Sequence, residues 1–240
     1  MPHAGAVRWG RMGRILILCP LAIEGRAARL AVGSREGVEV RITGPGERLL
    51  RALHEGVSDA DEKPALVVLA GVCGGMCECE RSPRVGHVMD LSGARWDAPE
   101  HGPPDPASRT PDAPVTVLGL HMAIESREAK RALCRRTGAA LVDMESHLFA
   151  RTCEQLGVRW CVIRGVSDNA RAGLVSGAEG WVDADGETIT RLVLRDCATR
   201  PWIVPAVLRL GLGTTLALRA VRRRLAALLD QQQHRADNPA

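Results

Sequence analysis

Short apolar runs alternate along most of the chain with segments that have helical spacing. Several of these runs, such as RILILC and ALVVLAG, are continuously apolar, which is typical of strands covered by helices on both faces. This alternation predicts an α/β fold of three layers, α/β/α, with a mostly parallel or mixed central sheet. The predicted strands cover residues 14–19, 38–43, 65–71, 85–91, 115–120, 139–144 and 160–167. The predicted helices cover residues 24–32, 46–56, 125–137 and 145–157.

The length of 240 residues suits one α/β domain with a sizeable core. We expect a loose N-terminal leader over 1–13, the catalytic domain over 14–199, and a basic C-terminal helix and tail over 200–240. Within the domain, residues 92–114 contain six prolines and almost no aliphatic side chains. Because strands resume directly after it, this segment is predicted to be a long loop, either a functional lid or an insertion.

Cysteine usage and the N-terminus both predict a cytoplasmic protein. Eight cysteines lie mostly inside apolar runs, so reduced, buried thiols are expected. The apolar run after Arg14 is short, contains Pro20 and lacks a small-residue cleavage site, which argues against an export signal. Cys77 and Cys79 follow Cys73 closely, but no second cysteine pair accompanies them, and we predict neither a metal site nor a cofactor.

The C-terminal segment 201–229 is basic and apolar at once. From Leu216 onward apolar residues recur at helical spacing with arginines between them, which predicts an amphipathic helix. Arg209, two glycines and two prolines interrupt the segment, so we expect no transmembrane span. Two placements remain open: docking on its own domain or a partner subunit, or lying in the interface of the inner membrane as a peripheral contact. Nucleic acid is not an expected partner, because aromatic residues are scarce and the basic residues share a helix with aliphatic ones.

Three acidic residues follow predicted strands directly, where a parallel sheet places active-site groups. Glu24 follows the first strand, Glu145 follows AALVDM, and Asp168 ends CVIRGVSD. Carboxyl groups at one sheet edge are candidates for acid–base chemistry. Glycines after ALVVLA would let a ligand approach the backbone closely. His147, beside Glu145, is expected in the core or behind the site.

Three motifs together resemble the nucleoside phosphorylase superfamily, which includes purine and uridine phosphorylases and methylthioadenosine and futalosine nucleosidases. They are Leu69–Gly75, Val142–Ser146 and Val162–Asp168, and the similarity spans about residues 14–199. Within the superfamily, the chain is most similar to the hopanoid-associated phosphorylase-like nucleosidases, on the evidence of VDMES, WVDADG and the C-terminal segment. The resemblance implies a phosphorylase/hydrolase-like fold and hydrolytic release of adenine from a lipid-linked nucleoside, adenosylhopane. It also implies a homo-oligomer.

The resemblance further implies a role for individual residues. Asp168 would protonate the purine at N7, and Glu24 would orient or deprotonate the attacking water. Met144 would pack on the ribose and Glu145 would bind its hydroxyls. The other expected substrate-binding residues are Gly71, Cys73, Gly74, Gly75, Val142, Asp143 and Ser167.

Some features leave alternatives open. A carboxylate at Glu24 would repel phosphate and favours water as the nucleophile, whereas Arg26 and Arg29 keep phosphorolysis possible. Phe149 lies past the ribose motif, and no aromatic partner for the base is identified. The alternatives are a soluble hydrolase or phosphorylase acting on methylthioadenosine, futalosine or purine nucleosides, and a non-catalytic nucleoside-binding protein.

Overall fold

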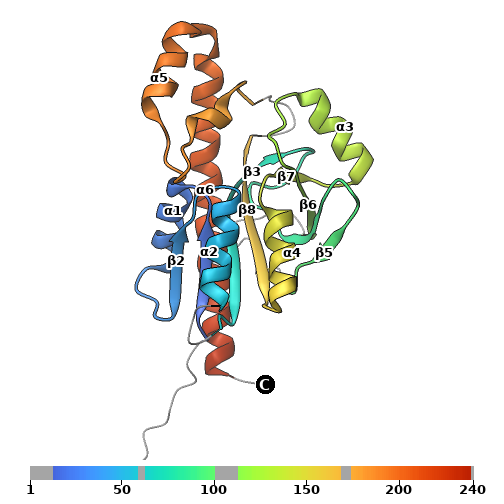
Figure 1. Ribbon diagram of the computed structural model, residues 1–240, viewed down its shortest axis with the longest axis vertical. Helices are drawn as coiled ribbons and strands as arrows, with labels where there is room; N and C mark the ends of the chain where they lie inside the picture. Colours follow the sequence, from blue (N-terminus) through green and yellow to red (C-terminus); the bar gives the residue numbers. More distant parts are fainter. Residues whose placement is uncertain (1–12, 59–62, 101–112, 169–173, 239–240) are drawn as a thin grey trace, which may run out of the picture.

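An eight-stranded mixed sheet forms the centre of the computed structural model, which describes residues 13–58, 63–100, 113–168 and 174–238 (Figure 1). The strand order is β2-β1-β3-β7-β6-β4-β5, and β8 also pairs with β3. The strands are β1 (Ile15–Cys19), β2 (Val38–Ile42), β3 (Leu66–Gly75), β4 (Val85–Met89), β5 (Arg95–Asp97), β6 (Val115–Gly119), β7 (Leu141–Asp143) and β8 (Trp160–Asp168). Neighbouring strands are parallel except for β3 with β7 and β4 with β5, so the predicted mixed sheet is confirmed.

Helices cover both faces of the sheet and complete the three layers (Figure 1). The helices are α1 (Ala22–Val32), α2 (Glu47–Ser58), α3 (Arg127–Thr137), α4 (Ser146–Leu156), α5 (Thr190–Thr199) and α6 (Val204–Asp237), with short 3-10 turns η1 (Ala178–Trp181) and η2 (Pro201–Ile203). Alternate residues of β1 point to the two opposite faces of the sheet. Leu16 and Leu18 pack in the cluster that contains α2 and α4, whereas Ile15 and Ile17 pack in the one that contains α1 and α6. Both faces of the strand are therefore buried, which explains its continuous apolar run.

The predicted strands and helices are all present. Three features of the structure differ from the prediction. The run Gly71–Gly75, expected to follow a strand, belongs to β3 itself and pairs with β8 and β7. The expected loop 92–114 contains β5, which pairs with β4, and its residues 101–112 lie outside the described part of the chain. Helix α5 and the turn η1 carry no prediction from the sequence. The leader 1–12 also lies outside the described residues.

Helix α6 is continuous over 34 residues and longer than the amphipathic segment predicted from Leu216. Pro205 lies in its first turn, where the missing N–H costs no hydrogen bond, and the helix passes through Gly211 and Gly213. These glycines and prolines therefore do not interrupt the helix, which corrects the expectation from the sequence. By length and composition, Pro201–Asp237 is the one described helix that could cross a membrane; its apolar window has a mean hydropathy of 1.4 and is 11% buried.

The two halves of α6 have different environments. All its buried residues lie from Ala217 onward, and Val221, Leu225 and Leu228 join the core beneath β1, β3 and β8. Gly165 of β8 permits this contact, because a β-carbon there would lie 2.6 Å from the Ala217 carbonyl oxygen. The first half of α6 projects beyond the sheet beside α5 (Figure 1). The second half is therefore part of the folded domain.

Candidate active site

A cavity of about 500 Å³ opens where β3, β7 and β8 end. One wall is polar and carries the side chains of Glu24, Lys130, Asp143, Glu145, Ser167 and Asp168. The opposite wall is largely apolar and comes from the loop before α3, from η1 and from the first half of α6. The cavity therefore combines a cluster of ionisable groups with an apolar surface, an arrangement that is common in small-molecule sites.

A register shift at the end of β8 aims Ser167 and Asp168 into the cavity. Cys73 pairs with Val166 but Gly74 pairs with Asp168, which leaves Ser167 as an extra residue in β8. Such bulges redirect side chains next to active sites. Ser167 Oγ lies 3.0 Å from Asp168 Oδ1 and 3.2 Å from the Cys73 carbonyl oxygen. The hydroxyl group therefore orients the carboxylate against β3, where Gly74 leaves room for it.

Glu24 is held at the start of α1 by two backbone donors. Its carboxylate accepts hydrogen bonds from Leu21 N at 2.8 Å and from Val72 N at 2.7 Å. Burial raises the pKa of Glu24 to about 7, although the nearby Arg164 and both hydrogen bonds oppose the shift. A buried carboxyl group that titrates near neutral pH can exchange protons with a bound water molecule.

Arg164 joins the acidic residues from inside the sheet. Its side chain is 1% exposed, and its Nη2 lies 2.6 Å from Asp143 Oδ2 and 3.5 Å from Glu145 Oε2. Burial disfavours the charged guanidinium, but the carboxylates of Asp143, Glu145 and Glu24 outweigh it and raise the pKa of Arg164. The pKa of Glu145 is raised to about 7, chiefly by burial. The ion pair between Arg164 and Glu145 keeps Glu145 in place, and the carboxylate of Glu145 faces the cavity.

Asp143 connects this cluster to α4. Its carboxylate accepts hydrogen bonds from Ser146 N at 3.1 Å and from Ser146 Oγ, at the first turn of the helix. A carboxylate is favourable there because it satisfies free backbone N–H groups. Asp143 lines the cavity, but its oxygens are engaged with Ser146 and Arg164.

Lys130 of α3 forms an ion pair with Asp168 inside the cavity. The lysine side chain is 1% exposed and that of Asp168 is 12% exposed. Among the described residues that line the cavity, Lys130 is the only basic one, whereas five are acidic: Glu24, Asp143, Glu145, Asp168 and Glu179.

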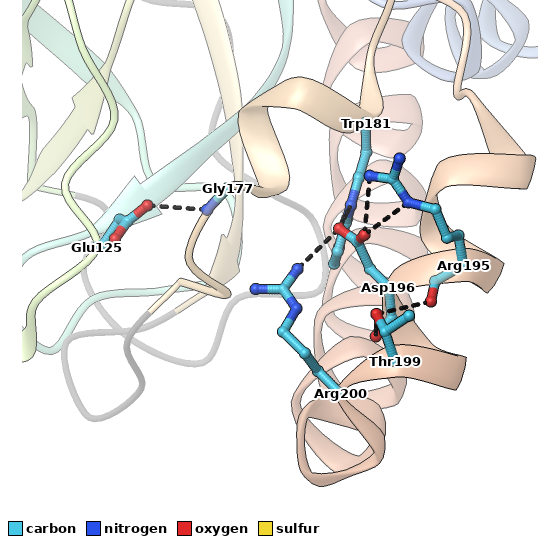
Figure 2. Close-up of polar contacts among 7 residues, drawn as sticks. All are labelled: Glu125, Gly177, Trp181, Arg195, Asp196, Thr199 and Arg200. Carbon is cyan, nitrogen blue, oxygen red and sulfur yellow. Dashed lines mark hydrogen bonds and ion pairs between the residues drawn. The ribbon is translucent and has the colours of Figure 1, made fainter.

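The rim of the cavity is fastened by polar contacts at η1 and α5 (Figure 2). Trp181 lines the cavity and donates a hydrogen bond from Nε1 to Asp196 Oδ2 at 2.9 Å. Arg195 and Arg200 form ion pairs with the same carboxylate, as Figure 2 shows. On the other side of the rim, Gly177 N donates to Glu125 Oε1 at 3.0 Å. These contacts place an indole ring over the cavity and tie η1 to the loop before α3.

Most of the expected site residues meet in this cavity. Its lining includes Glu24, Cys73, Gly74, Val142, Asp143, Met144, Glu145, Ser167 and Asp168. Gly71 and Gly75 do not line it. Gly71 lies against the side chains of Glu24 and Arg164, and Gly75 pairs with Leu141. Cys73 is buried, and desolvation raises the pKa of its thiol well above the ordinary value.

Other residues that the sequence singled out lie elsewhere. Arg26 and Arg29 are exposed on α1 outside the cavity, and Arg26 pairs with Glu187 at 3.7 Å. Phe149 is fully buried in the core, edge-on to Trp160. His147 is buried beneath Gly119, in edge contact with the ring of His121. In the described ranges, no group of three or more His, Cys, Asp or Glu side chains is arranged to hold a metal ion.

Three residues in or directly behind the cavity lining have no assigned role in the sequence interpretation. Arg164 lies inside the VIRGVSD motif, so its position beside the acidic residues was a usable signal. Lys130 is one of only two lysines among the 32 basic residues, a contrast that could have marked it. Trp181 lies in the WVDADG segment, but nothing local in the sequence points it into the cavity.

Comparisons with known proteins agree with this fold. The phosphorylase superfamily matches residues 108–196, a span that contains Asp143, Glu145, Arg164 and Asp168. A search of curated proteins finds no match. Solved structures share the fold over nearly the whole chain at low sequence identity.

These structures include two different enzymes of Helicobacter pylori. Its 5'-methylthioadenosine/S-adenosyl homocysteine nucleosidase is similar with a TM-score of 0.62 and 15% identity, over 92% of this chain and 99% of that one. Its futalosine hydrolase gives a TM-score of 0.61 and 15% identity, over 92% and 98%. The 5'-methylthioadenosine nucleosidase of Arabidopsis thaliana gives 0.56 and 11%, over 95% and 97%. The chain thus matches the phosphorylase superfamily over residues 108–196 and has, along more than nine-tenths of its length, the fold of these nucleosidases.

Proposed function

We propose that this protein hydrolyses the N-glycosidic bond of a purine nucleoside. The observation that carries the proposal is the grouping of Glu24, Glu145 and Asp168 around one cavity, with Arg164 paired with Glu145 from behind and acting electrostatically on Glu24. An oxocarbenium-like transition state needs a fixed sugar, a positioned water molecule and a protonated leaving group. The three carboxyl groups correspond to these three needs.

Each residue then has a distinct task. Glu145 accepts hydrogen bonds from the ribose hydroxyls, and Met144 packs on the sugar. Glu24, ionised for about half of the molecules near pH 7, takes a proton from water as its oxygen attacks C1′. Asp168, oriented by Ser167, transfers a proton to N7 so that the base leaves neutral.

Water is favoured over phosphate by the charges in the cavity. Among the described residues that line it five are acidic and one is basic, and although Arg164 pairs with Asp143 and Glu145 from behind, the remaining negative charge disfavours a phosphate ion there. Arg26 and Arg29 lie outside the lining and do not offset this charge. The electrostatics support hydrolysis.

We further propose a lipid-linked nucleoside, adenosylhopane, as the substrate. Val207, Leu210 and Gly211 of α6 extend the cavity with an apolar wall that suits a hydrocarbon substituent. The outer side of the same helix exposes Leu208 at 69% and Leu212 at 64%, and Trp202 of the preceding turn η2 is 72% exposed. The exposed Arg209 lies among them, a combination typical of helices that rest in a membrane interface. A peripheral contact with the inner membrane face would bring such a substrate within reach.

A soluble nucleoside is the second candidate. The solved structures with this fold act, by their names, on futalosine and methylthioadenosine, and the cavity volume suits such molecules. The homo-oligomer and the cytoplasmic location implied by the sequence stay predictions.

Chromatographic detection of free base tests the proposal directly. The purified protein is incubated with adenosylhopane in detergent, with methylthioadenosine and with futalosine, each with and without phosphate. Phosphate-independent adenine release from the lipid substrate alone would support the full proposal. Release from a soluble nucleoside alone would favour the second candidate, and no release from any substrate would overturn the function.

A further inference from the structure

Lys130 is an exceptional residue in its own helix. Of the eleven residues of α3 it is the only buried one, and its side chain is 1% exposed. The neighbouring charged residues of α3, Glu128, Arg131 and Arg135, are exposed. The helix therefore places one ammonium group in the cavity and keeps its other charges outside.

Burying an ammonium group is costly, and the cost is offset here by the carboxylate of Asp168. An apolar side chain would attach α3 to the domain at a lower cost. The other charged groups in this part of the cavity are the carboxylates of Glu24, Asp143 and Glu145, which face Arg164 and not Lys130. The lysine is therefore positioned for Asp168 specifically.

The ion pair poses a chemical problem for the proposed reaction. In the pair the proton resides on Lys130 and Asp168 is a carboxylate, which has no proton to donate to the purine. The proton required at N7 must therefore come through Asp168 from another group.

We propose that Lys130 is the source of the proton that Asp168 delivers to the purine. This inference rests on the proposed nucleosidase function. As the C1′–N9 bond breaks, its electron pair moves onto the base, N7 takes a proton from Asp168, and Asp168 takes one from Lys130 Nζ across their contact. The attacking water forms the new C1′–O bond and gives its proton to Glu24. After the products leave, solvent returns that proton to the neutral amine of Lys130, and the balance is water plus nucleoside to base plus the sugar, which keeps any 5′ substituent and carries a hydroxyl at C1′.

The composition of the chain supports lysine as the relevant group. Only Lys63 and Lys130 are lysines among the 32 basic residues, so arginine is the ordinary source of positive charge in this protein. An arginine would provide charge and hydrogen bonds, but its guanidinium group does not release a proton under these conditions. A lysine is needed where the proton itself must move.

Two substrates separate proton supply from simple positioning. A purine nucleoside needs protonation of its leaving group, whereas 4-nitrophenyl β-ribofuranoside releases nitrophenolate without it. We expect K130M to lower kcat for the nucleoside about 100-fold, but to lower nitrophenyl riboside cleavage by less than about threefold. K130R should not restore nucleoside cleavage, and K63M, which changes the exposed lysine, should match the wild type.

The combined variant K130M/D168N provides the second measurement. It removes both charges of the pair, so no buried carboxylate is left without a partner, and its thermal unfolding midpoint reports folding. If Lys130 acts through Asp168, this variant should cleave the nucleoside as slowly as D168N and no more slowly.

Four results would overturn the role of Lys130. These are an equal loss for both substrates in K130M, full rescue by K130R, nucleoside cleavage by K130M at the wild-type rate, or additive losses in the combined variant. If the wild-type protein releases no base from any nucleoside, the proposed function fails and this role fails with it. If the wild type releases base and K130M does so equally, only this role fails.

Discussion

Glu24 and Arg164 both direct their polar atoms at Gly71, in the middle of the sheet. A β-carbon at Gly71 would lie 2.3 Å from Glu24 Oε1 and 2.6 Å from Arg164 Nη1. The glycine is therefore required by the approach of these two side chains and not by its backbone conformation, since Gly71 has an ordinary negative φ inside β3. Gly71 is therefore the point of β3 at which a side chain of α1 and a side chain of β8 both pack against the strand.

Gly71→Ala should displace the side chains of Glu24 and Arg164. The added methyl group overpacks a buried site, which costs about 1–3 kcal/mol of unfolding free energy. Base release should fall at least about tenfold, because the displaced carboxylate no longer positions water. Gly180→Ala is the matched control, since its β-carbon would meet nothing within 4 Å. Equal effects of the two substitutions on base release would contradict the role given to this contact.

Glu24→Gln should remove the general base. Because the pKa of Glu24 is about 7, wild-type activity should rise with pH through 7 and level off above it. The variant should lose about 10²- to 10⁴-fold in kcat and should lack this rise. A pH–rate profile of both proteins measures the effect. A variant with wild-type kcat would exclude Glu24 as the base.

Ionisation of Glu24 should lower the stability of the protein as the pH rises, although it raises the activity. Its folded pKa of about 7 lies above the ordinary value of 4.5, so its contribution to stability is complete below pH 4.5 and is lost as the pH rises through 7. The loss is on the order of 3 kcal/mol for a shift of this size. Unfolding midpoints of wild type and Glu24→Gln, compared at pH 5 and pH 8.5, should converge or cross in favour of the variant at the higher pH. A constant difference between the two proteins would show that Glu24 does not titrate in this range.

Asp168→Asn should separate binding from cleavage. Asparagine keeps the shape of the side chain but cannot transfer a proton, so base release from a purine nucleoside should fall about 10²- to 10⁴-fold. Nucleoside binding, measured by calorimetry, should be retained because Glu145 and Met144 are unchanged. Unchanged base release would refute the acid role of Asp168.

The outer side of α6 should control membrane association. Replacing Leu208 and Leu212 by Gln removes two exposed apolar side chains and should reduce sedimentation with anionic vesicles several-fold, without lowering the unfolding midpoint. Leu30→Gln is the control, because Leu30 is exposed to the same extent, at 70%, on α1. If the control reduces vesicle binding equally, or if the double variant binds as the wild type does, the membrane contact does not involve this surface.

Local patterns in the sequence were sufficient for the strands other than β5, for helices α1 to α4 and for the acidic residues at the sheet edge. Continuous apolar runs arise when both faces of a strand are covered, and β1 shows this with Leu16 on one face and Ile17 on the other. Carboxyl-terminal ends of parallel strands meet at one edge, which is why Glu24 and Asp168 could be grouped without a structure. These properties depend on residues close in the sequence.

Long-range geometry determined the rest. Lys130 and Asp168 are separated by 38 residues, and no spacing rule predicts that α3 turns this lysine toward the end of β8. The extra residue Ser167 in β8 results from the register between β3 and β8, which depends on packing of the whole sheet. Helix α6 continues through Gly211 and Gly213 because one half packs in the core, and at Gly213 it lies so close to the Ser167 carbonyl oxygen that a β-carbon would approach it to 2.0 Å. The sequence by itself determined which chemical groups stand at the sheet edge, whereas only tertiary packing decided which of them touch, because contact energies between distant segments are absent from any local pattern.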